Sequence, residues 1–211
     1  MKTFVKICGI TSVQALDAVI STEADAIGFV IGVPDSPRNL SLYKARELRK
    51  RVPDGVKSII VMVPDSLKEV LDAIHYIEPD MIQLHNSNFD TSPIEIPIIK
   101  SLNQRTCLFE ARQLASTCDL LLLDSYHDKL YGGTGQLQDL RYSKIIIQRL
   151  KPQQVILAGG LTPGNVSEVI KHTEPYGVDV SSGVESSPGI KDAKKICDFV
   201  KKVKGIGDEI L

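Results

Sequence analysis

Eight short runs of apolar, largely β-branched residues recur along the chain, and most are separated by stretches that have the spacing of a helix. The runs are almost continuously apolar instead of alternating between apolar and polar residues, which indicates strands that are buried on both faces. A parallel sheet covered by helices has this property. The predicted strands span residues 3–7, 25–31, 57–63, 80–84, 96–99, 118–123, 154–158 and 177–180.

The segments between these runs carry helix-start signals, because a side-chain oxygen there can accept from the free N–H groups of a first helical turn. Pro163 also suits the first position of a helix that would run to about Lys171. The segment 86–106 is different, since Pro93 and Pro97 leave little room for a helix, and we expect an abbreviated helical layer there. The predicted helices begin at Thr11 or Ser12, Ser41, Ser66 and Thr162.

Strand–helix units repeated eight times in 211 residues predict one (β/α)8 barrel, a single α/β domain that spans residues 1–211. A doubly wound open sheet is the alternative. Against it, no GxGxxG follows the first run, and the glycine-rich loops come last in the sequence instead of first. In a barrel, functional side chains follow the carboxyl ends of the strands, so the residues just after each run are the candidates.

The composition is ordinary for a globular protein and excludes several classes. Charged residues make up 24% of the chain and the net charge is −1, so no nucleic-acid partner is expected. The apolar runs fall far short of the roughly 20 residues that span a bilayer, so no membrane partner is expected either. The N-terminus lacks a secretory pattern and the cysteines form no CxxC pair, which predicts a cytoplasmic protein without disulfides or a metal site.

Two candidates for acid–base chemistry stand at strand ends. Asp124 closes an apolar run, an unfavourable place for a carboxylate unless it is paired or used as an acid; capping a turn is the alternative. Cys8 follows the first run, where a thiolate could remove a carbon-bound proton, although a buried inert thiol explains the pattern equally well. Whether Lys6 supplies the cation that such a thiolate needs stays open.

Two loops and two further side chains complete the candidate site. Arg38 could pair bidentately with a substrate carboxylate, or it could be a solvated loop residue. His85 could contact a ligand or act as a base, or it could be a hydrogen-bonded structural group. Small residues after the last two runs suit phosphate binding by backbone N–H groups, although they could simply turn the chain; they are Gly159, Gly160, Ser181, Ser182 and Gly183.

Eight motifs follow one another along nearly the whole chain: KICGIT at 6–11, GFV at 28–30, SPR at 36–38, QLH at 83–85, LLDS at 122–125, YGGTG at 131–135, AGGLTPGNV at 158–166 and VDVSSGVESSPGIKD at 178–192. In this order they resemble the phosphoribosylanthranilate isomerase family, a barrel enzyme of tryptophan biosynthesis. The resemblance implies conversion of N-(5′-phosphoribosyl)anthranilate to 1-(o-carboxyphenylamino)-1-deoxyribulose 5-phosphate by an Amadori rearrangement. It implies no cofactor.

The resemblance also implies roles for individual residues. Asp124 would be the general acid that opens the ribose ring, and Cys8 the general base at C2′. Arg38 would hold the anthranilate carboxylate, and Asp179 would help to orient the sugar. The small-residue loops would hold the phosphate. The glycines at 132, 133 and 135 suggest a lid after the sixth predicted strand.

Two other functions stay open at this point. One is a related barrel isomerase of another phosphorylated aminosugar; a substrate with a phosphate at each end would need a second phosphate loop in the first half of the barrel. The other is a barrel that binds a phosphorylated ligand without catalysis. In each case the partner is a small phosphorylated molecule, and the protein is expected to be a monomer or a homodimer.

Overall fold

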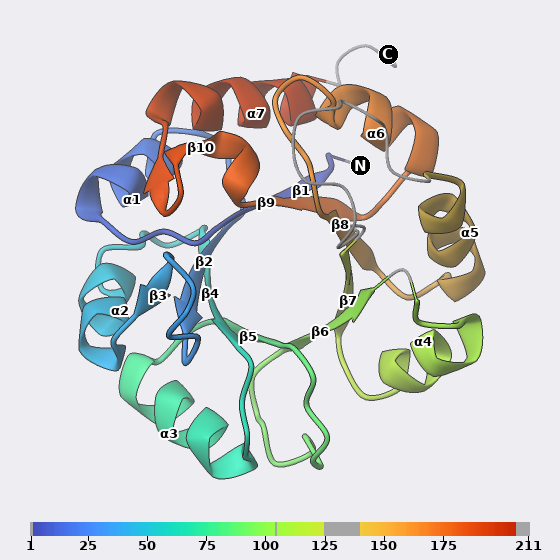
Figure 1. The fold of residues 1–211 in the computed structure, drawn as a ribbon, viewed down its shortest axis with the longest axis horizontal. Coiled ribbons are helices and arrows are strands. Elements are labelled where there is room, and N and C mark those ends of the chain that lie inside the picture. Colours follow the sequence, from blue (N-terminus) through green and yellow to red (C-terminus); the bar gives the residue numbers. More distant parts are fainter. Residues whose placement is uncertain (1, 104, 125–139, 206–211) are drawn as a thin grey trace.

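The computed structural model describes residues 2–103, 105–124 and 140–205. Parallel strands close into a barrel, because β1 pairs with β2 on one side and with β9 on the other (Figure 1). The predicted barrel is confirmed, each predicted strand overlaps an observed one, and the open sheet is excluded. The barrel strands are β1 (Phe4–Cys8), β2 (Ala26–Ile31), β4 (Lys57–Met62), β5 (Met81–Leu84), β6 (Ile98–Asn103), β7 (Leu120–Asp124), β8 (Val155–Ala158) and β9 (Gly177–Val180).

Helices cover the outside of the barrel, as Figure 1 shows. Three predicted helix starts are confirmed, because the hydroxyls of Ser12, Ser41 and Ser66 each accept from a backbone N–H three residues later. The helices are α1 (Val13–Ile20), α2 (Leu42–Arg49), α3 (Leu67–Ile77), α4 (Leu108–Ala115), α5 (Leu140–Leu150), α6 (Val166–Thr173) and α7 (Ala193–Gly205).

The predicted helix start at Thr162 is wrong, because α6 begins at Val166. The side chain of Asn165 fixes a turn ahead of the helix. Its Oδ1 accepts from the Thr162 N–H at 2.8 Å, and its Nδ2 donates to the Gly160 carbonyl at 3.0 Å. This asparagine therefore connects the start of α6 to the loop that follows β8.

The abbreviated helical layer is confirmed but is shorter than the predicted range of 86–106. Residues 85–97 form an irregular connection without a helix (Figure 1). The rest of the range is regular, because β6 pairs with β5 as far as Lys100 and with β7 as far as Asn103, and α4 follows from Leu108. The two prolines thus remove one helix and leave the strand after it intact.

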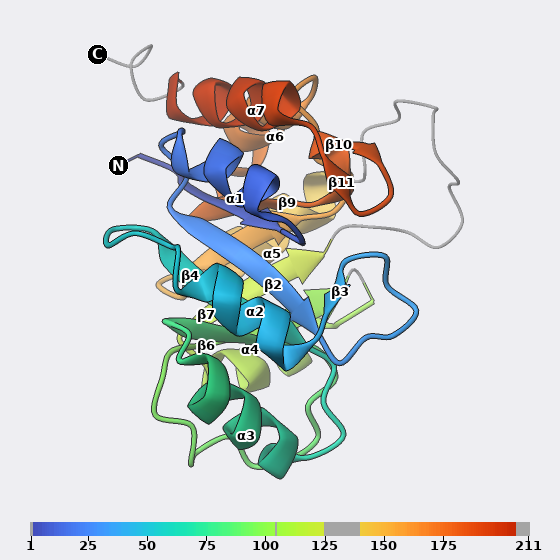
Figure 2. The ribbon, with the colours of Figure 1, turned by 90° about the vertical axis from the view of Figure 1, so that its left-hand side faces the viewer.

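Two apolar layers stabilise the barrel. The larger lies between the strands and the outer helices, and the smaller fills the barrel interior from Met81 and Ile99 up to Cys8 and Ala158. At the carboxyl end of the strands lie β3 (Asn39–Leu40), the 3-10 helix η1 (Ser182–Val184) and a hairpin of β10 (Glu185–Ser187) and β11 (Ile190–Lys191) (Figure 2). Within the described ranges, no helix is long and apolar enough to cross a membrane.

Candidate active site

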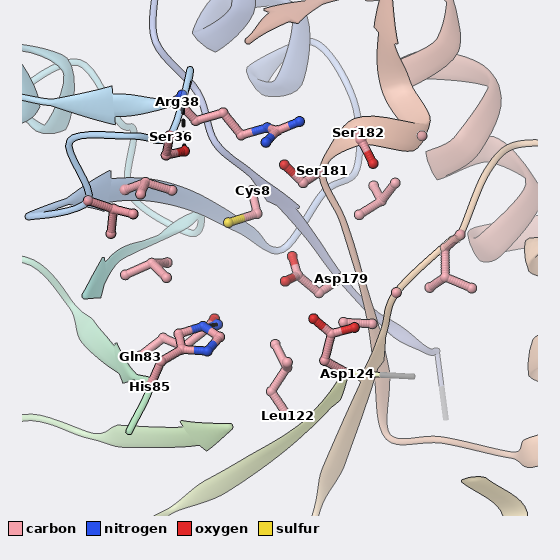
Figure 3. Close-up of a pocket in the computed structure, with 18 of the residues that line it drawn as sticks. Cys8, Ser36, Arg38, Gln83, His85, Leu122, Asp124, Asp179, Ser181 and Ser182 are labelled. Atoms are coloured by element: carbon pink, nitrogen blue, oxygen red, sulfur yellow. Dashed lines mark hydrogen bonds between the residues drawn. The ribbon is translucent and has the colours of Figure 1, made fainter. Parts of the chain in front are cut away.

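A cavity of about 340 Å³ lies at the carboxyl end of the barrel (Figure 3). Its lining comes from the ends of the strands and the loops that follow them, as expected for this fold. Every predicted site residue lines it: Cys8, Arg38, His85, Asp124, Gly159, Gly160, Asp179, Ser181, Ser182 and Gly183. The predicted lid and the YGGTG motif lie outside the described residues.

Cys8 is the last residue of β1, and its side chain points into the cavity (Figure 3). Gly28 lies beside it on β2, and a Cβ there would be only 2.8 Å from the Cys8 Sγ, so the glycine makes room for the thiol. Burial raises the pKa of Cys8 above its ordinary value. The charge on Lys6 opposes this rise, Asp179 adds to it, and Lys191 also opposes it.

Lys6 is fully buried inside the barrel, and its Nζ lies 3.0 Å from Asp179 Oδ2. Alternate residues of a strand face the same side, so Lys6 and Cys8 share the barrel interior. Burial lowers the pKa of Lys6, but the charges of Asp179 and Cys8 outweigh it and the net shift is upward. The sequence left open whether Lys6 is the cation beside Cys8, and the structure places it there.

Asp179 lines the cavity and carries a buried hydrogen-bond acceptor. Its carboxylate is almost completely buried, and while Oδ2 accepts from Lys6, Oδ1 has no hydrogen-bond partner among the described residues. A buried acceptor of this kind is costly unless a ligand or water satisfies it. The position suits a hydroxyl group of a bound molecule.

Asp124 ends β7, and Figure 3 shows its carboxylate and the Cys8 thiol both directed into the cavity. The strands that carry them are separated in the barrel by β8 and β9, so the two groups approach the cavity from different parts of its wall. A molecule held between them can thus be reached by a carboxyl group and a thiol at different atoms.

His85 follows β5 in the cavity wall and is held there by its neighbours. Its Nε2 lies 2.9 Å from Gln83 Nε2 and 3.3 Å from Ser101 Oγ. Burial lowers the pKa of His85 and the charge on Lys6 lowers it further, against the opposite influence of Asp124 and Asp179. The ring is therefore neutral near pH 7, and its Nε2 is assigned as the acceptor from Gln83. This contact favours the structural alternative, although the ring still lines the cavity.

The two small-residue loops lie against each other. A Cβ on Gly183 would be 1.8 Å from the carbonyl oxygen of Leu161, so only glycine allows the loops after β8 and β9 to approach this closely. Gly159 and Gly160 both adopt positive φ, at 91° and 65°. The two loops lie side by side in the cavity wall, to which they contribute the small residues Gly159, Gly160, Ser181, Ser182 and Gly183.

Arg38 is not a solvated loop residue. Its Nε and Nη2 donate to Glu185 Oε1 and Oε2, each at 2.7 Å, and the guanidinium is only partly exposed. Lys191 contacts the same carboxylate, with its Nζ 2.7 Å from Oε1. Sequence reasoning assigned no role to Glu185, although it stands in one of the motifs.

Gln83 and Ser36 are further polar residues of the lining that sequence reasoning did not single out. Gln83 is 2% exposed and lies within the otherwise apolar strand β5. A polar side chain inside a strand that is buried on both faces must find a partner, and that was the available signal. Ser36 lies in the loop before Arg38, and its hydroxyl accepts from the Arg38 N–H at 3.2 Å (Figure 3).

Known proteins resemble this chain in both sequence and fold. The N-(5′-phosphoribosyl)anthranilate isomerase of Haloferax volcanii is 38% identical over 212 residues, covering 96% of this chain and 93% of that protein. The enzyme of the same name from Thiobacillus denitrificans is 40% identical over 211 residues, covering 97% and 99%. The crystal structure of phosphoribosyl anthranilate isomerase from Thermotoga maritima superposes with a TM-score of 0.85 at 32% identity, covering 96% and 99%.

A further structure of phosphoribosyl anthranilate isomerase, in complex with reduced 1-(o-carboxyphenylamino)-1-deoxyribulose 5-phosphate, has a TM-score of 0.80 at 30% identity and covers 96% of this chain and 99% of that one. The family model of N-(5′-phosphoribosyl)anthranilate isomerase matches residues 5–202, which is nearly the whole chain. The chain therefore belongs to the N-(5′-phosphoribosyl)anthranilate isomerase family.

Proposed function

We propose that this protein converts N-(5′-phosphoribosyl)anthranilate to 1-(o-carboxyphenylamino)-1-deoxyribulose 5-phosphate in tryptophan biosynthesis, with Asp124 as general acid and Cys8 as general base. The observation that carries the proposal is the meeting of these two groups in one cavity that is also lined by Arg38 and the two small-residue loops. A related structure that binds the reduced product supports the choice of ligand.

The first two steps of the reaction need one proton donated and one removed. The Asp124 carboxyl protonates the ribose ring oxygen, the bond from that oxygen to C1′ breaks, and the nitrogen lone pair completes a Schiff base. The Cys8 thiolate then takes the proton from C2′, and the electrons of that C–H bond form the enolamine. Loss of the O2′ proton and protonation of C1′ give the aminoketone. Each group acts on its own atom without leaving its strand.

Two cations near Cys8, the ammonium groups of Lys6 and Lys191, would help to form the thiolate that the proposed base needs. The net shift of the Cys8 pKa is nevertheless upward, because burial and the charge of Asp179 disfavour the thiolate more than the cations favour it. Asp179 Oδ1 would accept from a sugar hydroxyl, because Asp179 lines the cavity and this buried atom has no hydrogen-bond partner among the described residues. His85 would contact the substrate as a neutral ring.

The ends of the substrate would be held on different parts of the wall. The phosphate would lie against Gly159, Gly160 and the loop from Ser181 to Gly183, small residues that line the cavity. The anthranilate carboxylate would lie against Arg38.

All four cysteines are free thiols, which supports the cytoplasmic location proposed for the protein.

Replacement of the acid and the base tests this mechanism. We expect Cys8→Ala and Asp124→Asn each to lower kcat by about 10²- to 10⁴-fold, the usual contribution of a positioned acid or base. Both variants should keep the wild-type circular dichroism spectrum and bind the reduced product, because neither replacement enlarges a side chain. Near-normal turnover by Asp124→Asn would overturn the assignment of the acid.

A further inference from the structure

Glu185 holds two cations on one buried carboxylate. Arg38 donates to both of its oxygens, Lys191 Nζ lies 2.7 Å from Oε1, and the Gly189 N–H donates to Oε2 at 3.2 Å. The side chain is 4% exposed. Glu185 begins β10 and pairs in register with Lys191 on β11, so the hairpin itself brings the carboxylate and the ammonium together.

The contact with Glu185 leaves one edge of Arg38 available. A guanidinium has five N–H groups in a plane, arranged as two edges that can each bind a carboxylate. Glu185 takes the edge formed by Nε and Nη2. The remaining edge, which includes Nη1, belongs to a residue that lines the cavity. Glu185 therefore fixes the plane of the guanidinium without competing for a ligand on the other edge.

Lys191 extends the same contact to the loop after β9. Its side chain is fully buried, and besides Glu185 its Nζ contacts the carbonyl oxygen of Ser181 at 3.0 Å and the Ser181 hydroxyl at 3.3 Å. Ser181 belongs to the loop proposed to bind phosphate. Through Lys191, the Glu185 carboxylate thus connects Arg38, proposed to bind the substrate carboxylate, with the loop proposed to bind the phosphate.

The charges of the cluster suit an anionic ligand. Arg38 and Lys191 carry two positive charges against the single negative charge of Glu185. Burial raises the pKa of Glu185, but hydrogen bonds from Arg38 and Lys191 outweigh it and hold the pKa below its usual value. Glu185 is therefore ionised at neutral pH, and the cluster keeps a net positive charge beside the cavity.

We propose that Glu185 is a specificity-determining positioning residue, which orients Arg38 toward the carboxylate of the substrate and, through Lys191, holds the loop at Ser181. Glu185 acts through Arg38 and Lys191 and does not itself touch the substrate. This inference rests on the proposed function, because it assumes an aromatic substrate that carries a carboxylate at one end and a phosphate at the other.

The test compares two substrates that differ only in that carboxylate, namely the phosphoribosyl conjugates of anthranilate and of aniline. We expect Glu185→Gln to lower kcat/KM for the anthranilate conjugate by ~10- to 100-fold through a higher KM, the effect of losing a charge-assisted hydrogen bond. For the aniline conjugate kcat/KM should fall much less, so the preference of the enzyme for the anthranilate conjugate decreases. Lys191→Met should lower kcat/KM for both conjugates by similar factors, because both carry the phosphate.

Controls separate positioning from a general structural effect. Glu23→Gln removes an exposed ion pair with Lys2 and should leave kcat/KM for both conjugates unchanged. A purely structural role would lower the melting temperature of Glu185→Gln and leave the substrate preference unchanged, and that result overturns the inference. If the glutamine variant does not fold, Glu185→Asp takes its place, because it keeps the charge on a shorter side chain. The inference then predicts that Glu185→Asp shows the same fall in preference for the anthranilate conjugate over the aniline conjugate. Wild-type protein inactive on the anthranilate conjugate would instead overturn the proposed function, and this inference with it.

Discussion

Gly183→Ala tests whether the contact between the two small-residue loops forms the phosphate site. The alanine Cβ would lie 1.8 Å from the Leu161 carbonyl oxygen, whereas ordinary contacts begin at 3.4 Å, so the loops must separate by about 1.6 Å. A hydrogen bond of about 2.9 Å does not survive that displacement. Loss of one bond to a charged group costs about 1.5–3 kcal/mol, which raises KM at least about tenfold.

The same clash should also reduce stability by about 1–3 kcal/mol, because the obstacle is backbone and not a flexible side chain. Steady-state kinetics and inhibition by inorganic phosphate measure the site, and thermal unfolding measures the fold. Gly164→Ala is the matched control, since the nearest atom to its Cβ is Thr162 Oγ1 at an ordinary 3.5 Å. Wild-type KM and phosphate inhibition in Gly183→Ala would refute the assignment of the loops.

Two further substitutions probe the base and the scaffold. Lys6→Met removes the ammonium that lowers the pKa of Cys8, so that pKa should rise further and alkylation of Cys8 by iodoacetamide, followed by mass spectrometry, should need a higher pH. Exposed Cys107 is the internal control, and an unchanged pH dependence at Cys8 would contradict the electrostatic role of Lys6. Ser66→Ala removes the cap of α3 and should reduce stability by about 0.5–2 kcal/mol in denaturant unfolding while kcat/KM stays unchanged; equal stability would contradict the capping role.

Much of the barrel could be predicted because its signals are local. Strands buried on both faces of a parallel sheet read as apolar runs, and a serine ahead of a helical segment satisfies N–H groups within three residues of itself. The Thr162 start failed for an equally local reason. Pro163 is compatible with a first helical turn, but the side chain of Asn165 stabilises a separate turn there.

The site was less predictable because its partners are far apart in the sequence. Lys6 and Asp179 are 173 residues apart, and Arg38 and Glu185 are 147 apart. Strand-end reasoning places such residues at the same end of the barrel, but it does not give the register that brings two side chains into contact. The ion pairs around Cys8 and Arg38 and the lining residues Gln83 and Ser36 therefore needed the structure, whereas the strand-end candidates could be expected to meet at one end of the barrel.

The most direct measurement is turnover of N-(5′-phosphoribosyl)anthranilate by the purified protein alone, followed as the loss of fluorescence of the anthranilate conjugate. The account predicts saturable conversion to 1-(o-carboxyphenylamino)-1-deoxyribulose 5-phosphate without any added cofactor, with the product identified by mass spectrometry and chromatography. Wild-type protein that is correctly folded yet converts the substrate no faster than the uncatalysed reaction would contradict it.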